Sequence, residues 1–118
     1  MANKLGPFVY ELAPTEGFSI TISAVGTGYA VIAGIDNVAL NFANGVPVVI
    51  TPQMMNGMGS IHTVNARCFF SVGATNNASY TITTADQNGA QLDTMTIPIV
   101  TPQPLPYQVL LQVVVGVR

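Results

Sequence analysis

Hydrophobic and polar residues alternate along most of this chain, which is the pattern of β-strands with one buried face. The clearest example is residues 18–25, FSITISAV, where apolar side chains occupy one face and Ser or Thr most of the other. No segment shows the i, i+3, i+4 spacing of an amphipathic helix over three turns. We therefore predict about nine strands, at 8–12, 18–25, 29–33, 38–42, 46–51, 61–73, 79–85, 91–100 and 107–117.

The last of these strands, YQVLLQVVVGV at 107–117, has apolar residues at all its odd positions and mixed residues between them. At ~3.3 Å per residue it spans roughly 36 Å, about twice the usual strand length. A strand this apolar would promote aggregation as a bare edge, so we expect this chain or another copy of it to cover the strand. If its apolar face is not satisfied internally, Val109, Leu111, Val113 and Val115 are the predicted interface.

Turn signals separate the predicted strands. Asn44-Gly45 is the strongest two-residue hairpin signal, and Asp86–Gly89 predicts a second hairpin. Residues 101–106, TPQPLP, predict an extended connector to the final strand. The loop at 52–60 carries Met54, Met55 and Met58, which either fold back over the core or form a second interface patch, because methionine suits both.

One stretch resembles a known family. Residues 76–82, NNASYTI, resemble the tyrosine corner at the start of strand F in immunoglobulin-like sandwiches, with Tyr80 as the corner residue. The hairpin that follows, up to residue 100, is similar to the F–G hairpin of immunoglobulin-like repeats in bacterial surface adhesins and phage virion proteins. Unlike antibody domains, the chain has no Trp and no cysteine pair. The resemblance implies a domain used for adhesion, spacing or assembly, without catalytic apparatus.

Together these patterns predict one domain over residues 1–118. Its fold class is all-β, an antiparallel β-sandwich that is immunoglobulin-like, with a jelly roll as the alternative. Residues 107–117 form an extra strand beyond the point where a simple immunoglobulin domain would end.

Charge is scarce in this sequence. Charged residues make up 7%, against about 25% in typical globular proteins, and the net charge is −2. Three scattered cations cannot neutralise a run of phosphates, which argues against nucleic-acid binding, and they cannot form a polybasic membrane patch. No apolar run approaches the ~20 residues of a membrane span, and the N-terminus has no signal-peptide core. A surface of this kind suits a covered subunit, in a virion or in the cytoplasm before assembly.

The groups that could carry catalysis are few. His62, with Ser60 nearby, could form an acid/base pair, or it is simply a polar residue at the start of a strand. Cys68 is in register with Val64 and Ala66, which predicts a buried, inert thiol. No zinc-ligand spacing is present, and Ile97 stands where a calcium loop from Asp86 would need Glu. We expect no catalytic residue, metal or cofactor.

The sequence therefore predicts a non-enzymatic structural or assembly protein that forms a homo-oligomer. The alternative is a module that binds a saccharide or another protein through polar loops at one end of the sandwich. The candidate ligand residues are Asp36, Asn37, Asn76, Asn77, Asp86 and Asn88, several of which also suit turn geometry.

Overall fold

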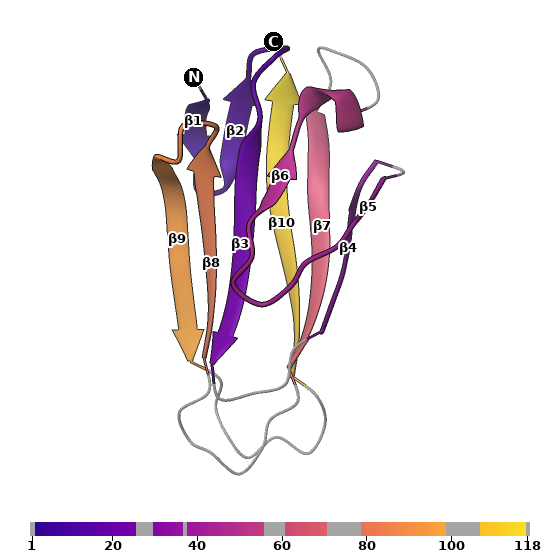
Figure 1. The fold of residues 1–118 in the computed structure, drawn as a ribbon, viewed down its shortest axis with the longest axis vertical. Coiled ribbons are helices and arrows are strands. Elements are labelled where there is room, and N and C mark those ends of the chain that lie inside the picture. Colours follow the sequence, from indigo (N-terminus) through magenta and orange to yellow (C-terminus); the bar gives the residue numbers. More distant parts are fainter. Residues whose placement is uncertain are drawn as a thin grey trace.

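The computed structural model describes residues 2–25, 30–36, 38–55, 61–70, 79–98 and 107–117. Within these ranges the chain forms β-strands and one short 3-10 helix, η1, at Pro52–Met54 (Figure 1). The strands are β1 (Asn3–Gly6), β2 (Val9–Leu12), β3 (Phe18–Val25), β4 (Ala30–Ile35), β5 (Val38–Leu40), β6 (Val48–Ile50), β7 (Ile61–Phe70), β8 (Ser79–Asp86), β9 (Gln91–Pro98) and β10 (Tyr107–Val117).

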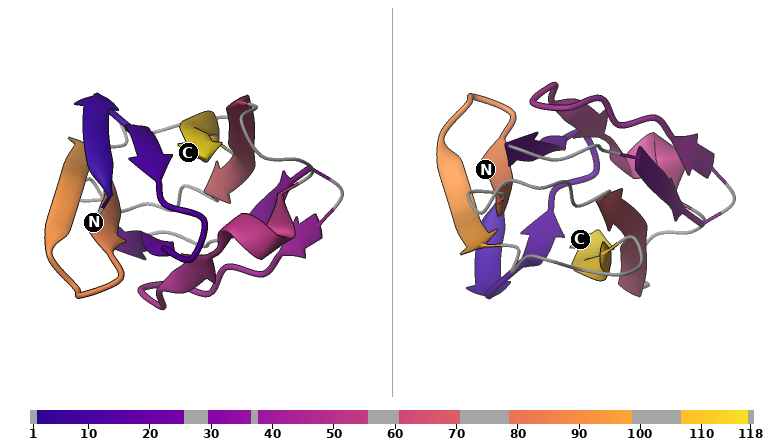
Figure 2. Two further views of the ribbon diagram at one scale, coloured as in Figure 1. Left: turned by 90° about the horizontal axis from the view of Figure 1, so that it is seen from above. Right: turned by 90° about the horizontal axis from the view of Figure 1, so that it is seen from below.

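These strands form two sheets, of six strands in the order β1-β2-β10-β7-β4-β5 and of four in the order β6-β3-β8-β9. Seen along the strands, the sheets form two layers with their apolar faces turned toward each other (Figure 2). The prediction of an all-β sandwich is confirmed. Such a two-layer arrangement is common to immunoglobulin-like sandwiches and jelly rolls.

The core follows from the alternation in the sequence. Strand β3 buries Phe18, Ile20 and Ile22 and leaves the Ser and Thr side chains between them only partly buried, as its pattern predicts. The facing six-stranded sheet contributes the even positions of β7 and the odd positions of β10. Fully buried side chains from both sheets include Tyr10, Leu12, Phe18, Ile20, Ile22, Ile50, Val64, Ala66, Cys68, Ile82, Val113 and Val115.

Strand β10 has the predicted bounds and lies inside its sheet, between β2 and β7 (Figure 1). It is antiparallel to β7 from Tyr107↔Phe70 to Gly116↔Ile61, and it is parallel to β2 from Val114↔Val9 to Val117↔Leu12. The expectation that something covers this strand is confirmed, and its own chain does so. The parallel pair is the one departure from a purely antiparallel sandwich among the described strands.

The predicted hairpin at Asn44-Gly45 is wrong. The strands on either side of it lie in different sheets, because β5 pairs with β4 whereas β6 pairs with β3. Asn44 instead joins the side of β3, where its Oδ1 accepts from Ala24 N–H at 2.8 Å and its Nδ2 donates to Ala24 O at 3.0 Å. Gly45 N–H donates to Ile22 O at 3.0 Å, with Gly45 at φ 75°. Asn44 and Gly45 therefore hold the segment in which the chain passes from one sheet to the other. Pro47 directly precedes β6, which is an edge strand, where proline is tolerated because no sheet hydrogen bond is lost.

The hairpin in this region is β4–β5, which closes between Ile35 and Val38. Asp36 has φ 51°, a left-handed conformation that two-residue hairpin turns require. Gly34 is needed beside this turn, since a Cβ there would lie 3.0 Å from Val38 O.

The β8–β9 hairpin lies where Asp86–Gly89 predicts it. Asp86 Oδ1 accepts the N–H groups of Asn88 and Ala90, both at 2.9 Å, and Gly89 has φ 85°. Strand β1 was not predicted, because NKLG has no apolar alternation. It forms as an edge strand on β2.

Candidate functional site

The predicted interface on β10 belongs to the core of this chain. Val113 and Val115 are fully buried, Leu111 is 6% exposed, and Val109 is partly buried against the same cluster. The condition attached to that prediction, an apolar face not satisfied internally, is therefore not met. Because side-chain direction alternates, the opposite face of β10 is the one that points away from the core.

The methionine patch is only partly described. Met55 is 8% exposed and belongs to the core cluster, and Met54 packs against that cluster from η1. Met58 lies outside the described residues. The two methionines that the structure places thus fold back over the core, which was one of the two expectations.

The predicted ligand residues do not come together as one site. Asp36 lies in the β4–β5 turn, whereas Asp86 and Asn88 lie in the β8–β9 turn on the other side of the sandwich (Figure 1). Asn37, Asn76 and Asn77 lie outside the described residues. The Asp86 carboxylate is engaged by its own turn, so turn geometry accounts for it.

Asp36 has a buried partner that the sequence did not suggest. Its Oδ2 lies 2.8 Å from Nδ1 of His62, whose side chain is 4% exposed at the start of β7. This contact ties the β4–β5 turn to the neighbouring strand. The pair considered from sequence, His62 with Ser60, falls partly outside the described residues. His62 is therefore held in the interior beside a carboxylate.

A second polar cluster joins the two sheets near β1. The Tyr10 hydroxyl donates to Asp93 Oδ2 at 2.5 Å and also bonds to Thr84 Oγ1. Lys4 Nζ lies 2.7 Å from Asp93 Oδ1, and Phe8 N–H donates to Asp93 Oδ2 at 3.2 Å. Phe8 has φ 56°, so this bond helps to hold a backbone conformation that a bulky residue rarely adopts. The cluster ties β1 and β2 to β8 and β9.

The ionisation of this cluster follows from its surroundings. Burial, followed by the bond to Asp93, raises the pKa of Tyr10, which therefore stays protonated and donates. Burial alone would raise the pKa of Asp93, but the bonds from Lys4, Tyr10 and Phe8 N–H outweigh it, and the net pKa is lowered. The Asp93 carboxylate thus binds an ammonium, a hydroxyl and a backbone amide, and these contacts link strands of the two sheets.

Cys68 lies at 0% exposure in the core, and burial raises the pKa of its thiol to about 11. The thiol therefore has little thiolate character near neutral pH and cannot be reached by a substrate. Among the described residues, no group of three or more His, Cys, Asp or Glu side chains could hold a metal ion. Within the same residues, no helix is long and apolar enough to cross a membrane.

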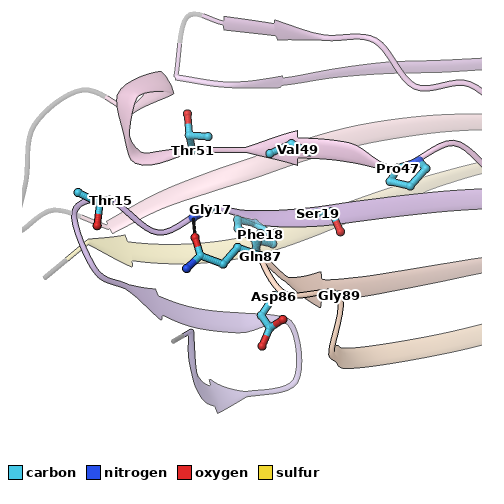
Figure 3. A pocket seen from close by; sticks show the side chains of 10 residues that line it. All are labelled: Thr15, Gly17, Phe18, Ser19, Pro47, Val49, Thr51, Asp86, Gln87 and Gly89. Carbon is cyan, nitrogen blue, oxygen red and sulfur yellow. Dashed lines mark hydrogen bonds between the residues drawn. The ribbon is translucent and has the colours of Figure 1, made fainter.

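A groove of about 400 Å³ runs along the outside of the four-stranded sheet (Figure 3). Its floor comes from β3 and β6, and the β8–β9 turn forms its other side. Gln87 reaches across to Gly17, the residue before β3, and its Oε1 accepts from Gly17 N–H at 3.4 Å. The lining mixes hydroxyl, amide and apolar groups, from Thr15, Gly17, Phe18, Ser19, Pro47, Val49, Thr51, Asp86, Gln87 and Gly89.

The groove opens onto a surface of hydroxyl groups on the same sheet. Thr81 and Thr96 are bonded across β8 and β9 at 2.9 Å, and Thr83 and Thr94 at 3.1 Å. Within each pair the two hydroxyl groups are hydrogen-bonded to each other, so the surface is polar without being charged.

No element of the described residues covers the outward side of the six-stranded sheet, which we call the outer face. It is formed by the alternate residues of each strand whose side chains point away from the core. Its side chains from the described residues are Asn3, Leu5, Val9, Glu11, Ala30, Ile32, Ala39, Ile61, Thr63, Asn65, Arg67, Phe69, Leu110, Gln112 and Val114. Within this set, Asn3 Nδ2 donates to Glu11 Oε1 at 3.4 Å.

Large aliphatic side chains stand out from the outer face. Ile61 is 78% exposed, Ile32 69%, Leu5 66% and Leu110 61%. Two shallow hollows lie between them. One, of about 250 Å³, lies over Gly116 and is lined by Val9, Glu11 and Ile61 among others. The other, of about 260 Å³, lies beside Gly34 and is lined by Ile32, Arg67 and Leu110 among others.

The residues of β10 predicted as an interface are buried in the core of this chain, whereas Leu110 on the other side of the strand is exposed. In the sequence, Leu110 interrupts the polar positions Gln108 and Gln112. The pairing that places Leu110 beside Arg67 and Ile32 joins strands far apart in the sequence, so it could be seen only in the structure. No protein-family model, curated protein or solved structure matches this chain.

Proposed function

We propose that this protein is a non-enzymatic structural subunit that assembles with copies of itself through the outer face. The observation that carries the proposal is the exposure of four large aliphatic side chains on one sheet surface that no other element of the described chain covers. The four side chains lie in two groups on that face, Leu110 and Ile32 on either side of Arg67, and Ile61 and Leu5 near Gly116. Large exposed apolar groups gathered on one face are typical of protein interaction sites. Isolated exposed apolar side chains would not indicate an interaction site, but these four share one face of a sheet.

The rest of the chain supports the same class of function. The polar clusters at Asp93 and Asp36 are engaged in holding the sandwich together, and Cys68 is buried. The scarce charge suits a surface that becomes covered in a virion or at a cell surface. The resemblance of residues 76–100 to immunoglobulin-like domains of adhesins and phage virions points to adhesion or assembly as well.

A charged residue in the middle of the outer face tests the proposal. Light scattering after size exclusion should show an oligomer for the wild type and a monomer for Leu110→Asp, because an interface would have to bury the new carboxylate. Leu110 is 61% exposed, so the monomer should remain folded by circular dichroism. The matched control is Thr96→Asp on the exposed side of the other sheet, which should leave the oligomer intact. A monomeric wild type at high concentration would rule the proposal out.

The groove gives a second candidate function, saccharide binding. It places the Gln87 amide and the Ser19 and Thr51 hydroxyls beside the apolar surface of Pro47 and Val49, a mixture that suits a sugar ring. This observation favours the groove over the separate turns predicted from sequence.

A glycan array distinguishes this second function. If the groove binds a saccharide, the wild type should bind a glycan on the array and Ser19→Trp should not, because the indole would fill the groove. Thr96→Trp, on the same sheet but outside the groove, should keep the signal. An array on which the wild type binds no glycan would count against the groove as a saccharide site.

A further inference from the structure

We infer that a second copy of this chain docks on the outer face about a two-fold axis, so that Arg67 of each copy pairs with Glu11 of the partner subunit. The inference rests on the proposed function, because it names the geometry of the assembly that the outer face would form.

The first support is the distribution of charge. Among the described side chains of the outer face, two carry a charge: Arg67 on β7 and Glu11 on β2. They have opposite signs and lie on opposite sides of β10. Arg67 is level with Leu110, and Glu11 is level with Gly116. Six residues of β10 separate the two levels, which is about 20 Å along the strand.

A two-fold axis makes this arrangement self-complementary. In an isologous dimer, if residue i contacts residue j of the partner, residue j also contacts residue i. An axis that lies in the plane of the face and crosses the middle of β10 exchanges the Arg67 and Glu11 positions. The dimer then gains two identical ion pairs, one on each side of the axis.

The positions of the two hollows are consistent with the same two-fold axis. The hollow beside Gly34 is lined by Arg67, and the hollow over Gly116 is lined by Glu11, so the axis exchanges the two hollows along with the charges. Leu110 of one copy is thereby brought toward the partner's hollow over Gly116. A Cβ built on Gly116 meets no atom within 4 Å, so there is open space at this point.

The size of the face is also suitable. Strands β7 and β10 are each roughly 35 Å long, and six strands at ~4.8 Å spacing are about 24 Å across. Because the outer strands are short, the six strands together cover roughly 600 Å² in projection, about three quarters of the ~800 Å² that each partner buries in a standard interface. Charge pairs at such an interface determine the register of docking more than its strength.

Charge exchange tests the pairing on the full chain. Arg67→Glu and Glu11→Arg, made singly, should each weaken self-association at least about tenfold, because two like-charge contacts replace two ion pairs. The double variant should regain wild-type association. When the two single variants are mixed, each contact of the heterodimer joins Glu to Arg, so native mass spectrometry should show heterodimers in preference to either homodimer. Asn88→Arg, a charge added at an exposed turn of the other sheet, is the control and should associate normally.

The outcomes separate this inference from the proposed function. A wild type that oligomerises and is disrupted by Leu110→Asp, but is indifferent to both charge reversals, would overturn the pairing and leave the assembly function standing. Failure of the double variant or of the mixture to recover association would overturn the pairing as well. A monomeric wild type would overturn both. Circular dichroism of each variant confirms that the fold is kept, since both charged positions lie on the surface of the sheet.

Discussion

Val113→Asp is expected to abolish folding of this domain. Val113 lies at 0% exposure in the middle of β10, paired with the equally buried Val64 and facing the other sheet. A carboxylate at this position would lose its hydration without gaining a partner, at a cost of several kcal/mol. Because domains of this size have about 5–15 kcal/mol of total stability, we expect circular dichroism to show an unfolded or aggregated chain.

A neighbouring substitution separates burial from simple disruption of the strand. Gln112→Asp introduces the same side chain one residue earlier, on the exposed side of β10. It should change the free energy of unfolding by less than about 1 kcal/mol. A milder core change, Val113→Ala, should cost about 2 kcal/mol through lost burial and the cavity left behind. A Val113→Asp protein with a normal melting transition would show that β10 is not part of the core.

Tyr10→Phe is expected to destabilise the protein by about 1–3 kcal/mol. The change keeps the buried ring, which lies 5.5 Å from the Phe18 ring, and removes only the hydroxyl that links Asp93 and Thr84. Thr84 is fully buried, so a lost partner there is not replaced by water. Urea denaturation measures the effect.

The exposed pair of Thr83 and Thr94 provides the matched control for this change. Thr94→Val also removes one hydroxyl from a cross-strand bond, but water can replace the lost partner. Its effect should stay below about 0.5 kcal/mol. Equal effects of the two substitutions would mean that the Tyr10 hydroxyl does not tie the sheets together.

The same cluster predicts a pH dependence. The folded protein holds the pKa of Asp93 below its unfolded value, so the stabilisation is fully present above about pH 4 and is lost as the pH falls through the folded pKa. Asp93→Asn should therefore be less stable than the wild type at neutral pH. The difference between the two proteins should shrink in acid, and a difference that stays constant would contradict the assignment.

Several elements could be predicted from the sequence because their signals are local. The alternation in 18–25 specifies a half-buried strand whatever its neighbours, and β3 has those bounds. Asp86–Gly89 contains its own turn chemistry, in which the Asp86 side chain bonds the backbone of the same turn. The length of β10 was visible for the same reason, as was the burial of Cys68.

Asn44-Gly45 shows where local signals fail. Two residues can specify a turn, but they cannot specify which strands the chain joins on either side. Here the partner of Asn44 is the backbone of Ala24, twenty residues away. The pairing of β6 with β3 is likewise long-range, and no pattern within residues 38–51 indicates it.

The outer face, too, could be predicted only in part from the sequence. The sequence determined that β10 has one apolar and one mixed face, that charge is scarce, and that little chemistry is available. Only the tertiary structure decided that the apolar face fills this chain's own core, since this depends on the second sheet packing against it. It also placed Leu110, Arg67 and Ile32 side by side from three strands. The physical reason is that strand alternation is a property of neighbouring residues, whereas register and sheet order are set by contacts between residues far apart in the chain.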